Sequence, residues 1–222
     1  MNKRVIVIAT HPDDEILGCG GTIARHIADG DIVKTVVVCE GMTLRYNDSE
    51  MDLDECRRNA AKVLGVHENV CLQKRDQRLD SLPMLELVQA IEKEVYDFKP
   101  NVVYCQNGND INHDHKLVFE AAQIAFRPLK EYIEEVYTFY TVSSTEWGSP
   151  IGFMPDTWVD ITNYLELKIK AFNCYETEVN AFPHPRSIES IEHMAHFFGA
   201  QAYMNSAECF QTVKRYIRET NT

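Results

Sequence analysis

Apolar runs and amphipathic segments alternate along the first part of the chain. Residues 5–8 and 33–39 are short runs rich in valine and isoleucine, which is typical of strands buried on both faces of a sheet. Residues 16–29, between them, have apolar side chains at helical spacing. A strand, a helix and a strand in this order predict a right-handed βαβ unit and therefore a parallel sheet. Three glycines predict a close approach of this helix to the sheet: Gly18, Gly20 and Gly21.

The same alternation continues to the end of the chain. Further strands are predicted at residues 70–73, 101–105 and 136–142. Further helices are predicted at residues 54–64, 84–98, 117–124, 160–175, 187–198 and 202–218. Together these elements predict an α/β fold in which helices pack on a mostly parallel sheet.

The length and composition of the chain favour one domain. Its 222 residues, of which 45% are hydrophobic, can bury a large core, and no repeat or low-complexity tract indicates a division. We therefore expect a single domain over residues 1–222.

No apolar run approaches the roughly 20 residues that cross a bilayer. The apolar run after Lys3 and Arg4 is short and ends without a small-residue cleavage site, so we expect a cytoplasmic protein without a membrane span.

Charge and cysteine content argue against two other classes of protein. The formal net charge of −12 disfavours a nucleic-acid surface, which would need clustered lysine and arginine. The seven cysteines are scattered and contain no Cys-x-x-Cys pair, so we expect reduced, mostly buried thiols instead of a disulfide framework. Cys19 lies near the polar cluster described next, where it is either a neighbour of a site or a packing residue.

Polar side chains follow the first predicted strand where a helix begins. His11, Asp13 and Asp14 stand at its carboxyl end, and in open α/β sheets ligands bind beyond the carboxyl ends of the strands. His11 and Asp14 are separated by two residues and can bend onto one divalent ion. Asp13 would then be free to act as a base. The alternative is a helix N-terminus that the acidic residues only cap, with His11 as an ordinary loop residue.

A second polar cluster, residues 107–115, follows the predicted strand at residues 101–105 and precedes another helix. It contains His113, Asp114 and His115. Two polar clusters at equivalent ends of two strands are difficult to explain as helix caps. The sequence therefore predicts a metal site that both clusters share.

Both clusters resemble a known family, the PIG-L or LmbE-like zinc-dependent de-N-acetylases. The family's Ala-His-Pro-Asp-Asp-Glu motif is matched at residues 10–15, and its His-x-Asp-His motif is matched in part at residues 112–115. Further stretches resemble one branch of the family, which acts on amino-sugar derivatives: EGMTLR (40–45), DQRLD (76–80), DINHDH (110–115), RP (127–128), SSTEW (143–147), FMPDTWVDI (153–161) and PHPRS (183–187).

The resemblance implies a fold, a metal and residue roles. The implied fold is a single-domain, Rossmann-like three-layer sandwich with the active site at the strand carboxyl ends. The metal, Zn²⁺ or another divalent ion, would be held by His11, Asp14 and His115. Asp13 would be the general base, and Asp114 would support the ligands, as carboxylates behind metal ligands do.

The sequence departs from the family pattern at two positions. Thr10 replaces the usual alanine, and Asn112 stands where many members have a histidine. An amide can still donate a hydrogen bond to a developing oxyanion, and another imidazole can supply positive charge. His184, between two prolines, is our candidate, and the alternative is a rigid surface turn. His113 occupies the variable position of the motif and is expected to point away.

Two further side chains are candidates for substrate contacts. Arg45, in a predicted loop at the same end of the sheet as His11, either contacts a polar or anionic part of the substrate or is a solvated loop residue. Trp147 either stacks on the apolar face of a sugar ring or packs within the protein.

These residues predict a zinc-dependent N-deacetylase that releases acetate from an N-acetylated amino sugar or sugar conjugate. The expected partner is therefore a small molecule, and a homo-oligomeric assembly is left open. Three alternatives are a de-N-acylase of another small amide, a non-catalytic sugar-binding protein on the same fold, and a metal hydrolase of another bond such as a phosphoester.

Overall fold

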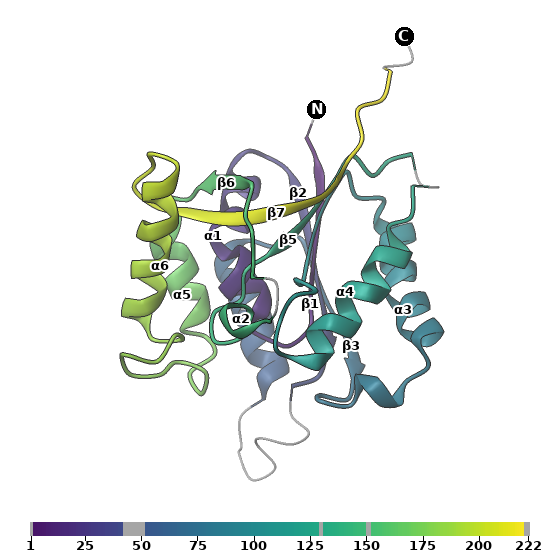
Figure 1. Ribbon diagram of the computed structural model, residues 1–222, viewed down its shortest axis with the longest axis horizontal. Helices are drawn as coiled ribbons and strands as arrows, with labels where there is room; N and C mark the ends of the chain where they lie inside the picture. Colours follow the sequence, from purple (N-terminus) through teal and green to yellow (C-terminus); the bar gives the residue numbers. More distant parts are fainter. Residues whose placement is uncertain (1, 42–51, 129–130, 150–151, 220–222) are drawn as a thin grey trace.

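Most of the sheet is parallel. The structure, a computed structural model, describes residues 2–41, 52–128, 131–149 and 152–219. In these residues seven strands lie in the order β3-β2-β1-β4-β5-β7-β6 (Figure 1). β1 to β5 pair with one another in parallel, whereas β7 pairs antiparallel with both β5 and β6. The α/β fold and the mostly parallel sheet expected from the sequence are confirmed.

Helices cover both faces of the sheet. The strands are β1 (Arg4–Ala9), β2 (Ile32–Cys39), β3 (Glu68–Lys74), β4 (Val102–Cys105), β5 (Glu135–Phe139), β6 (Thr157–Asp160) and β7 (Ala207–Arg215). The helices are α1 (Asp14–Ala28), α2 (Leu53–Leu64), α3 (Met84–Phe98), α4 (His113–Ala125), α5 (Leu165–Phe172) and α6 (Ile188–Gln201), with short 3-10 turns η1 (Leu79–Ser81) and η2 (Thr145–Trp147). α3 and α4 lie on one side, and α1, α2, α5 and α6 lie on the other (Figure 1).

The alternation of side chains along β1 divides the core into two parts. Val5 and Val7 face the cluster that includes apolar residues of α1, α2 and α5. Ile6 and Ile8 face the opposite cluster, which α3 and α4 complete. All four side chains are fully buried, as expected for a central strand with helices on both of its faces.

Glycines in α1 let this helix lie close to its neighbours. A Cβ at Gly18 would lie 2.3 Å from a ring carbon of Phe139 in β5, and one at Gly21 would lie 2.7 Å from Ile161. Both distances are far below van der Waals contact, so larger residues would push α1 away. The close approach to the sheet predicted from the sequence is confirmed for Gly18, whereas Gly21 approaches the residue that follows β6.

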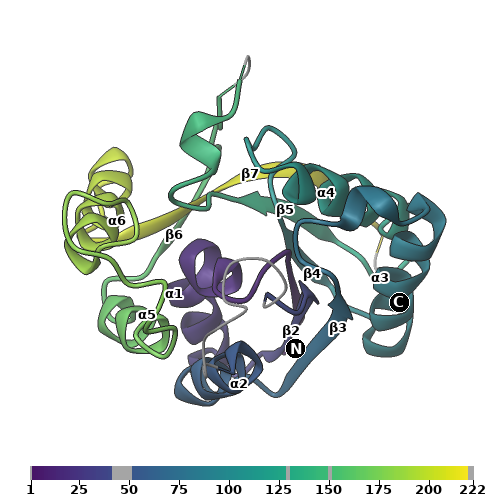
Figure 2. The same ribbon diagram turned by 90° about the horizontal axis from the view of Figure 1, so that it is seen from below.

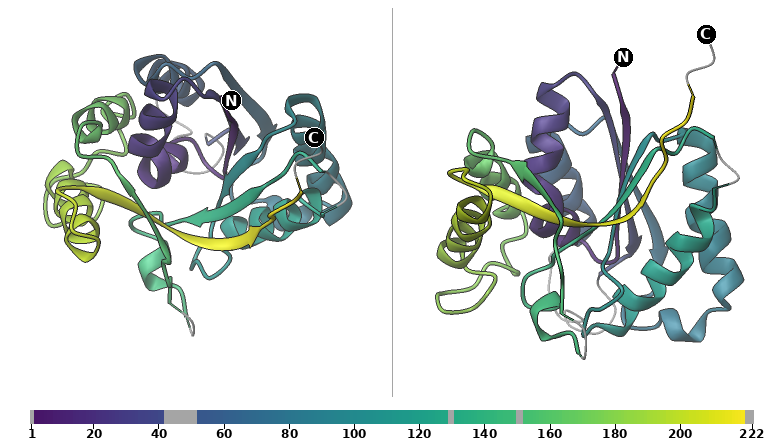
Figure 3. Two further views of the ribbon diagram at one scale, coloured as in Figure 1. Left: turned by 90° about the horizontal axis from the view of Figure 1, so that it is seen from above. Right: turned by 45° about the horizontal axis from the view of Figure 1, so that its top comes forward.

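The helix predicted at residues 202–218 is wrong, because most of this segment is strand β7. The helical spacing of its apolar residues is accidental. Phe210 packs into the core cluster on one face of the sheet, whereas Val213 packs against the cluster on the other face. Pairing with β5 and β6 therefore overrides the local pattern, which is a tertiary effect. Figure 3 shows β7 in yellow, running alongside β5.

The helix predicted at residues 160–175 is also too long. Asp160 ends strand β6, which was not predicted, and α5 occupies only Leu165–Phe172. Residues 157–160 alone are too short to show a strand pattern, and β6 is specified by its pairing with β7. The helix predicted at residues 187–198 is confirmed as α6.

A buried ion pair ties these C-terminal elements to α1. Lys168 of α5 donates from Nζ to Glu208 Oε1 of β7 at 2.7 Å and to the carbonyl oxygen of Leu17 at 2.8 Å. The Glu208 carboxylate also accepts the backbone N–H groups of Gly21 and Thr22, at 3.0 and 2.7 Å. Each charge therefore has partners that compensate for its burial.

The parallel strands end together at one edge of the molecule, which Figure 2 views from below. β1 and β4 are neighbours, and the chain proceeds from β1 to one side of the sheet and from β4 to the other. In open α/β sheets the crevice at such a reversal is a common position for ligands. Within the described residues, no helix combines the length and apolar character that a membrane span requires.

Candidate metal and catalytic site

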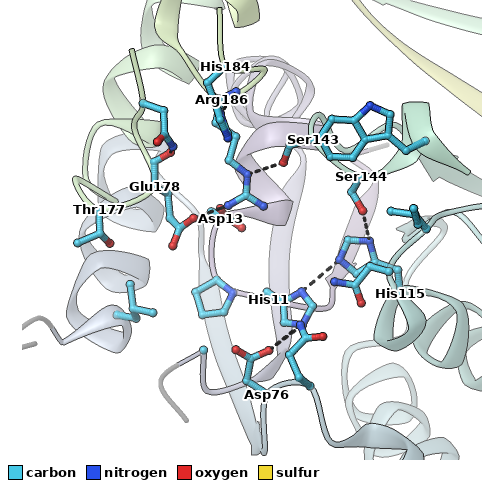
Figure 4. A pocket seen from close by; sticks show the side chains of 18 residues that line it. His11, Asp13, Asp76, His115, Ser143, Ser144, Thr177, Glu178, His184 and Arg186 are labelled. Carbon is cyan, nitrogen blue, oxygen red and sulfur yellow. Dashed lines mark hydrogen bonds and ion pairs between the residues drawn. The ribbon is translucent and has the colours of Figure 1, made fainter. Parts of the chain in front are cut away.

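A pocket of about 460 Å³ opens beside the carboxyl ends of β1 and β4 (Figure 4). Its walls come from segments that are far apart in the sequence: the loop after β1, residues 76 and 77, the loop before α4, the segment from residue 143 to 147, and the loop between α5 and α6. Of the predicted site residues, His11, Asp13, Asn112, His115, Trp147 and His184 line this pocket.

The structure brings three predicted metal ligands into contact. His11 Nδ1 lies 3.1 Å from His115 Nε2 and 3.4 Å from Asp14 Oδ2, and His115 Nε2 lies 3.2 Å from Asp14 Oδ2. We call these three residues the donor triad. His11 and Asp14 flank the start of α1, and His115 comes from the first turn of α4.

The spacing of the donor triad fits a small divalent ion. In a tetrahedral zinc site with bonds of about 2.0–2.1 Å, neighbouring ligand atoms lie about 3.3 Å apart, which is close to the three measured distances. The second oxygen of Asp14, Oδ1, is buried without a hydrogen-bond partner. Burial alone would raise the pKa of Asp14, but His115 and His11 hold it well below its usual range, so the carboxylate is charged.

Other carboxylates fix the orientation of both imidazole rings. Asp76 Oδ1 lies 3.0 Å from His11 Nε2, and Asp110 Oδ2 lies 3.1 Å from His115 Nδ1. In each ring the nitrogen outside the triad therefore faces a carboxylate, which is the usual arrangement behind metal-binding histidines. Asp114, predicted to support the ligands, has its Oδ2 at 3.6 Å from His11 Nε2.

A second group of possible ligands shares His11. Cys39 and Asp114 also bring ligand atoms to within 4.8 Å of one another and of this histidine. Burial raises the pKa of the Cys39 thiol to about 11, so this thiol is protonated when no metal is bound. The donor triad, in contrast, consists of the three ligands predicted from the sequence. Cys19, considered as a site neighbour, lies instead in the apolar core.

Asp13 is adjacent to the triad but does not cap the helix. It occupies the N-cap position of α1, yet its side chain makes no capping hydrogen bond. The carboxylate instead accepts a hydrogen bond from Arg186 Nη1 at 2.8 Å. Burial raises the pKa of Asp13 well above its usual value, although the charge of Arg186 opposes this effect. A buried carboxyl with a raised pKa suits proton transfer near neutral pH.

The remaining predicted residues occupy the walls and the rim. Asn112 caps α4 by accepting the N–H of Asp114 at 2.9 Å, which leaves its NH₂ group as a donor. His184 is exposed, and its Nδ1 accepts the backbone N–H of Arg186 at 3.0 Å. Trp147 is 54% exposed. Arg45 lies outside the described residues.

Several polar residues of the site were missed at the sequence level, including Glu178, which lies outside every stretch noticed in the sequence. Arg186 belongs to the PHPRS stretch, Asp76 to DQRLD and Asp110 to DINHDH, so each lies in a motif that was noticed without being given a role. No local pattern reveals the partners of these residues. Arg186 and Asp76 contact residues that are distant in the sequence, and Asp110 meets His115 only because the loop before α4 folds back.

Comparisons with known proteins agree with this chemistry. A family model described as PIG-L: GlcNAc-PI de-N-acetylase matches residues 6–126. The chain is 29% identical over 184 residues to the uncharacterized deacetylase YaiS of Escherichia coli (strain K12), covering 79% of this chain and 93% of that protein. It is 26% identical over 193 residues to diacetylchitobiose deacetylase of Thermococcus kodakarensis, covering 79% of this chain and 70% of that protein.

A solved structure extends the likeness to the whole fold. The 4-carboxy-2-hydroxymuconate hydratase from Pseudomonas putida KT2440 matches with a TM-score of 0.78 at 22% sequence identity, covering 99% of this chain and 100% of that chain. At this level of identity the likeness concerns the fold and not the reaction.

Proposed function

The chain belongs to the PIG-L family of de-N-acetylases, and from this premise we propose that it hydrolyses the acetamide group of an N-acetylated amino sugar or sugar conjugate. The observation that carries the proposal is the donor triad, with its atoms 3.1–3.4 Å apart beside the buried carboxyl of Asp13. A relative of this chain bears the name diacetylchitobiose deacetylase, which supports an N-acetylated sugar as the substrate class.

In the proposed mechanism the chain supplies the metal ligands, the base and hydrogen-bond donors. A divalent ion held by His11, Asp14 and His115, for which we propose Zn²⁺, would acidify a water molecule and polarise the acyl oxygen. Asp13 takes the proton as the water oxygen attacks the acyl carbon. Asp13 then gives this proton to the nitrogen as the carbon–nitrogen bond breaks, so that acetate and a free amine leave.

Asn112 and His184 are the proposed donors. The Oδ1 atom of Asn112 is occupied by the helix cap, so its NH₂ group is available to the acyl oxygen as negative charge develops. The Nδ1 atom of His184 accepts a backbone hydrogen bond, so the proton of the neutral ring is on Nε2. We propose that this Nε2–H group assists the leaving nitrogen.

The rim of the pocket suits a sugar ring. Trp147 and Ile111 both line it, and their side chains are 54% and 57% exposed. The backbone N–H of Ile111 points to the carbonyl oxygen of Ser144, 3.5 Å away, so the two segments lie side by side. These side chains offer an apolar surface to the C–H face of a sugar, while polar residues of the opposite wall face its hydroxyl groups.

A substrate panel tests the proposed function. Zinc-loaded protein is incubated with free, nucleotide-linked and lipid-linked N-acetylglucosamine compounds, simple amides and a phosphoester, and the appearance of amine and acetate is measured. We expect turnover of at least one N-acetylated sugar that is abolished by a chelator and restored by zinc. Release of phosphate from the phosphoester without any release of amine, or binding of sugars without turnover, would each replace this proposal.

A further inference from the structure

One arginine joins three separate segments at the wall of the pocket. Arg186, in the loop before α6, donates from Nε to Ser143 Oγ at 2.8 Å and from Nη1 to Asp13 Oδ2 at 2.8 Å. The same Nη1 atom also contacts the carboxylate of Glu178. Figure 4 shows the guanidinium group of Arg186 between Asp13, Glu178 and Ser143. We call these four residues the Arg186 cluster.

Asp13 is buried and has an unusual backbone conformation. Its backbone has a φ of 108°, which is unusual for a residue other than glycine, and its N–H group donates to Glu15 Oε2 at 3.1 Å. Its side chain is 2% exposed and makes no capping hydrogen bond to the helix. A carboxylate buried to this extent needs a charged or hydrogen-bonded partner, and Arg186 is that partner.

Arg186 is in turn fixed from another side. Its side chain is 15% exposed, and Glu178 holds it with a side chain that is 10% exposed. Burial by itself would lower the pKa of Arg186, but Asp13 and Glu178 raise it, so the guanidinium stays charged. A planar guanidinium held by several acceptors has little rotational freedom, unlike a lysine ammonium group at the same place.

We propose that Arg186 is the positioning residue for Asp13. By holding Oδ2, it sets the side-chain rotamer of Asp13 and directs Oδ1 toward the pocket, where this oxygen receives the proton. Glu178 and Ser143 keep the guanidinium in place. The inference rests on the proposed function, because it assumes that Asp13 is the base, and it adds a residue from outside the two metal-site motifs to the proton-transfer machinery.

Kinetic measurements on single variants give the first test. Arg186→Ala should lower kcat by about 10²-fold, the loss that misplacement of a reacting group by about 1 Å produces. KM should change less than threefold, and the zinc content should remain that of the wild type. Glu178→Gln should lower kcat by a smaller factor, and guanidinium ion added to Arg186→Ala should restore part of the rate. Arg127→Ala is the matched control, since Arg127 is an exposed arginine paired with Glu92.

A double-mutant cycle tests whether Arg186 acts through Asp13. In the Asp13→Asn background, removal of Arg186 should cost almost nothing further, because groups that act as one unit are not additive. An equal loss in both backgrounds would overturn the proposal. So would a rise in KM at unchanged kcat, which would make Arg186 a substrate ligand. If Arg186→Ala does not fold, Arg186→Lys enters the same cycle.

A structural readout separates this inference from the proposed function. Crystal structures of Arg186→Ala and Arg127→Ala should differ at one point: the Asp13 carboxylate leaves its position in the first and keeps it in the second. The donor triad should be unchanged in both. If Asp13 stays in place without Arg186, the positioning role is wrong even when the enzyme deacetylates sugars. If Asp13 moves in a protein that cleaves no acetamide, only the proposed function is wrong.

Discussion

The parallel half of the sheet and the C-terminal region contribute differently to the pocket. The segments that follow β1 and β4, up to the first turns of α1 and α4, carry all three residues of the donor triad. These segments lie inside the range that the family model matches. Residues 157–215 contribute β6, β7, α5, α6 and the loop that carries Glu178 and Arg186. Under the proposed mechanism, metal binding and orientation of the base are separate tasks, performed by separate parts of the chain.

The largest expected effect comes from a substitution that removes metal binding and leaves Asp13 in place. His115→Ala removes one of the three proposed metal ligands. Changes behind metal ligands already lower metal affinity by 10–100-fold, so we expect the zinc affinity to fall by at least about a hundredfold and turnover to be lost. Metal content after dialysis measures zinc binding, and the rate of amine release measures turnover. His113→Ala, two residues earlier on α4, is the matched control and should retain metal and activity. Retention of bound zinc by His115→Ala would remove this residue from the metal site.

The next prediction distinguishes the proposed role of Asp13 as the base from the role of the metal ligands. Asp13→Asn should keep zinc at the wild-type level but lower turnover by about 10²–10⁴-fold, the usual contribution of general base catalysis. An amide of the same shape cannot accept the proton. Asp29→Asn, beyond the other end of α1, is the control. Near wild-type turnover by Asp13→Asn would show that another group takes the proton.

The parallel half of the fold could be predicted because its signals are local. The runs at residues 5–8 and 33–39 are buried on both faces by helices, so each reads as a strand without knowledge of its partners. The motif around His11 sits directly after such a run, which places it at a strand end. The meeting of His11 with His115 follows from the rule that parallel strands end together.

The C-terminal region could not be predicted in this way. In β7, the spacing of Cys209, Phe210 and Val213 fits a helix as well as a strand, and only pairing with β5 and β6 decides between them. Arg186 shows the same limit within the site. Its partners Asp13 and Ser143 are 173 and 43 residues away, so no pattern in its own neighbourhood indicates that it contacts Asp13.

A third prediction concerns a substitution that destabilises the C-terminal region and leaves the donor triad unchanged. Lys168→Met leaves the buried carboxylate of Glu208 without its cation, and we expect the free energy of unfolding to fall by about 3–5 kcal/mol. Urea unfolding measures it. Lys170→Met, on the exposed side of α5, should change it by less than about 0.5 kcal/mol.

The partner substitution checks the cause of that loss. Adding Glu208→Gln to Lys168→Met removes the unpaired charge and should recover part of the lost stability. Zinc binding of Lys168→Met under native conditions should stay at the wild-type level, because no residue of the donor triad touches Lys168 or Glu208 in the contacts described above. A loss of zinc from the folded variant would show that the two regions are coupled.

The smallest expected effect concerns the rim of the pocket, to which η2 contributes Trp147. Trp147→Ala should raise KM about tenfold at nearly unchanged kcat, because stacking on a sugar contributes on the order of 1.4 kcal/mol equally to the bound substrate and the transition state. Trp147→Phe should restore most of the affinity. Trp158→Phe, in β6 and outside the pocket, is the control. A fall in kcat at constant KM would instead assign Trp147 to the orientation of the reacting groups, as proposed for Arg186, and the rim would then belong with the base-positioning part of the site.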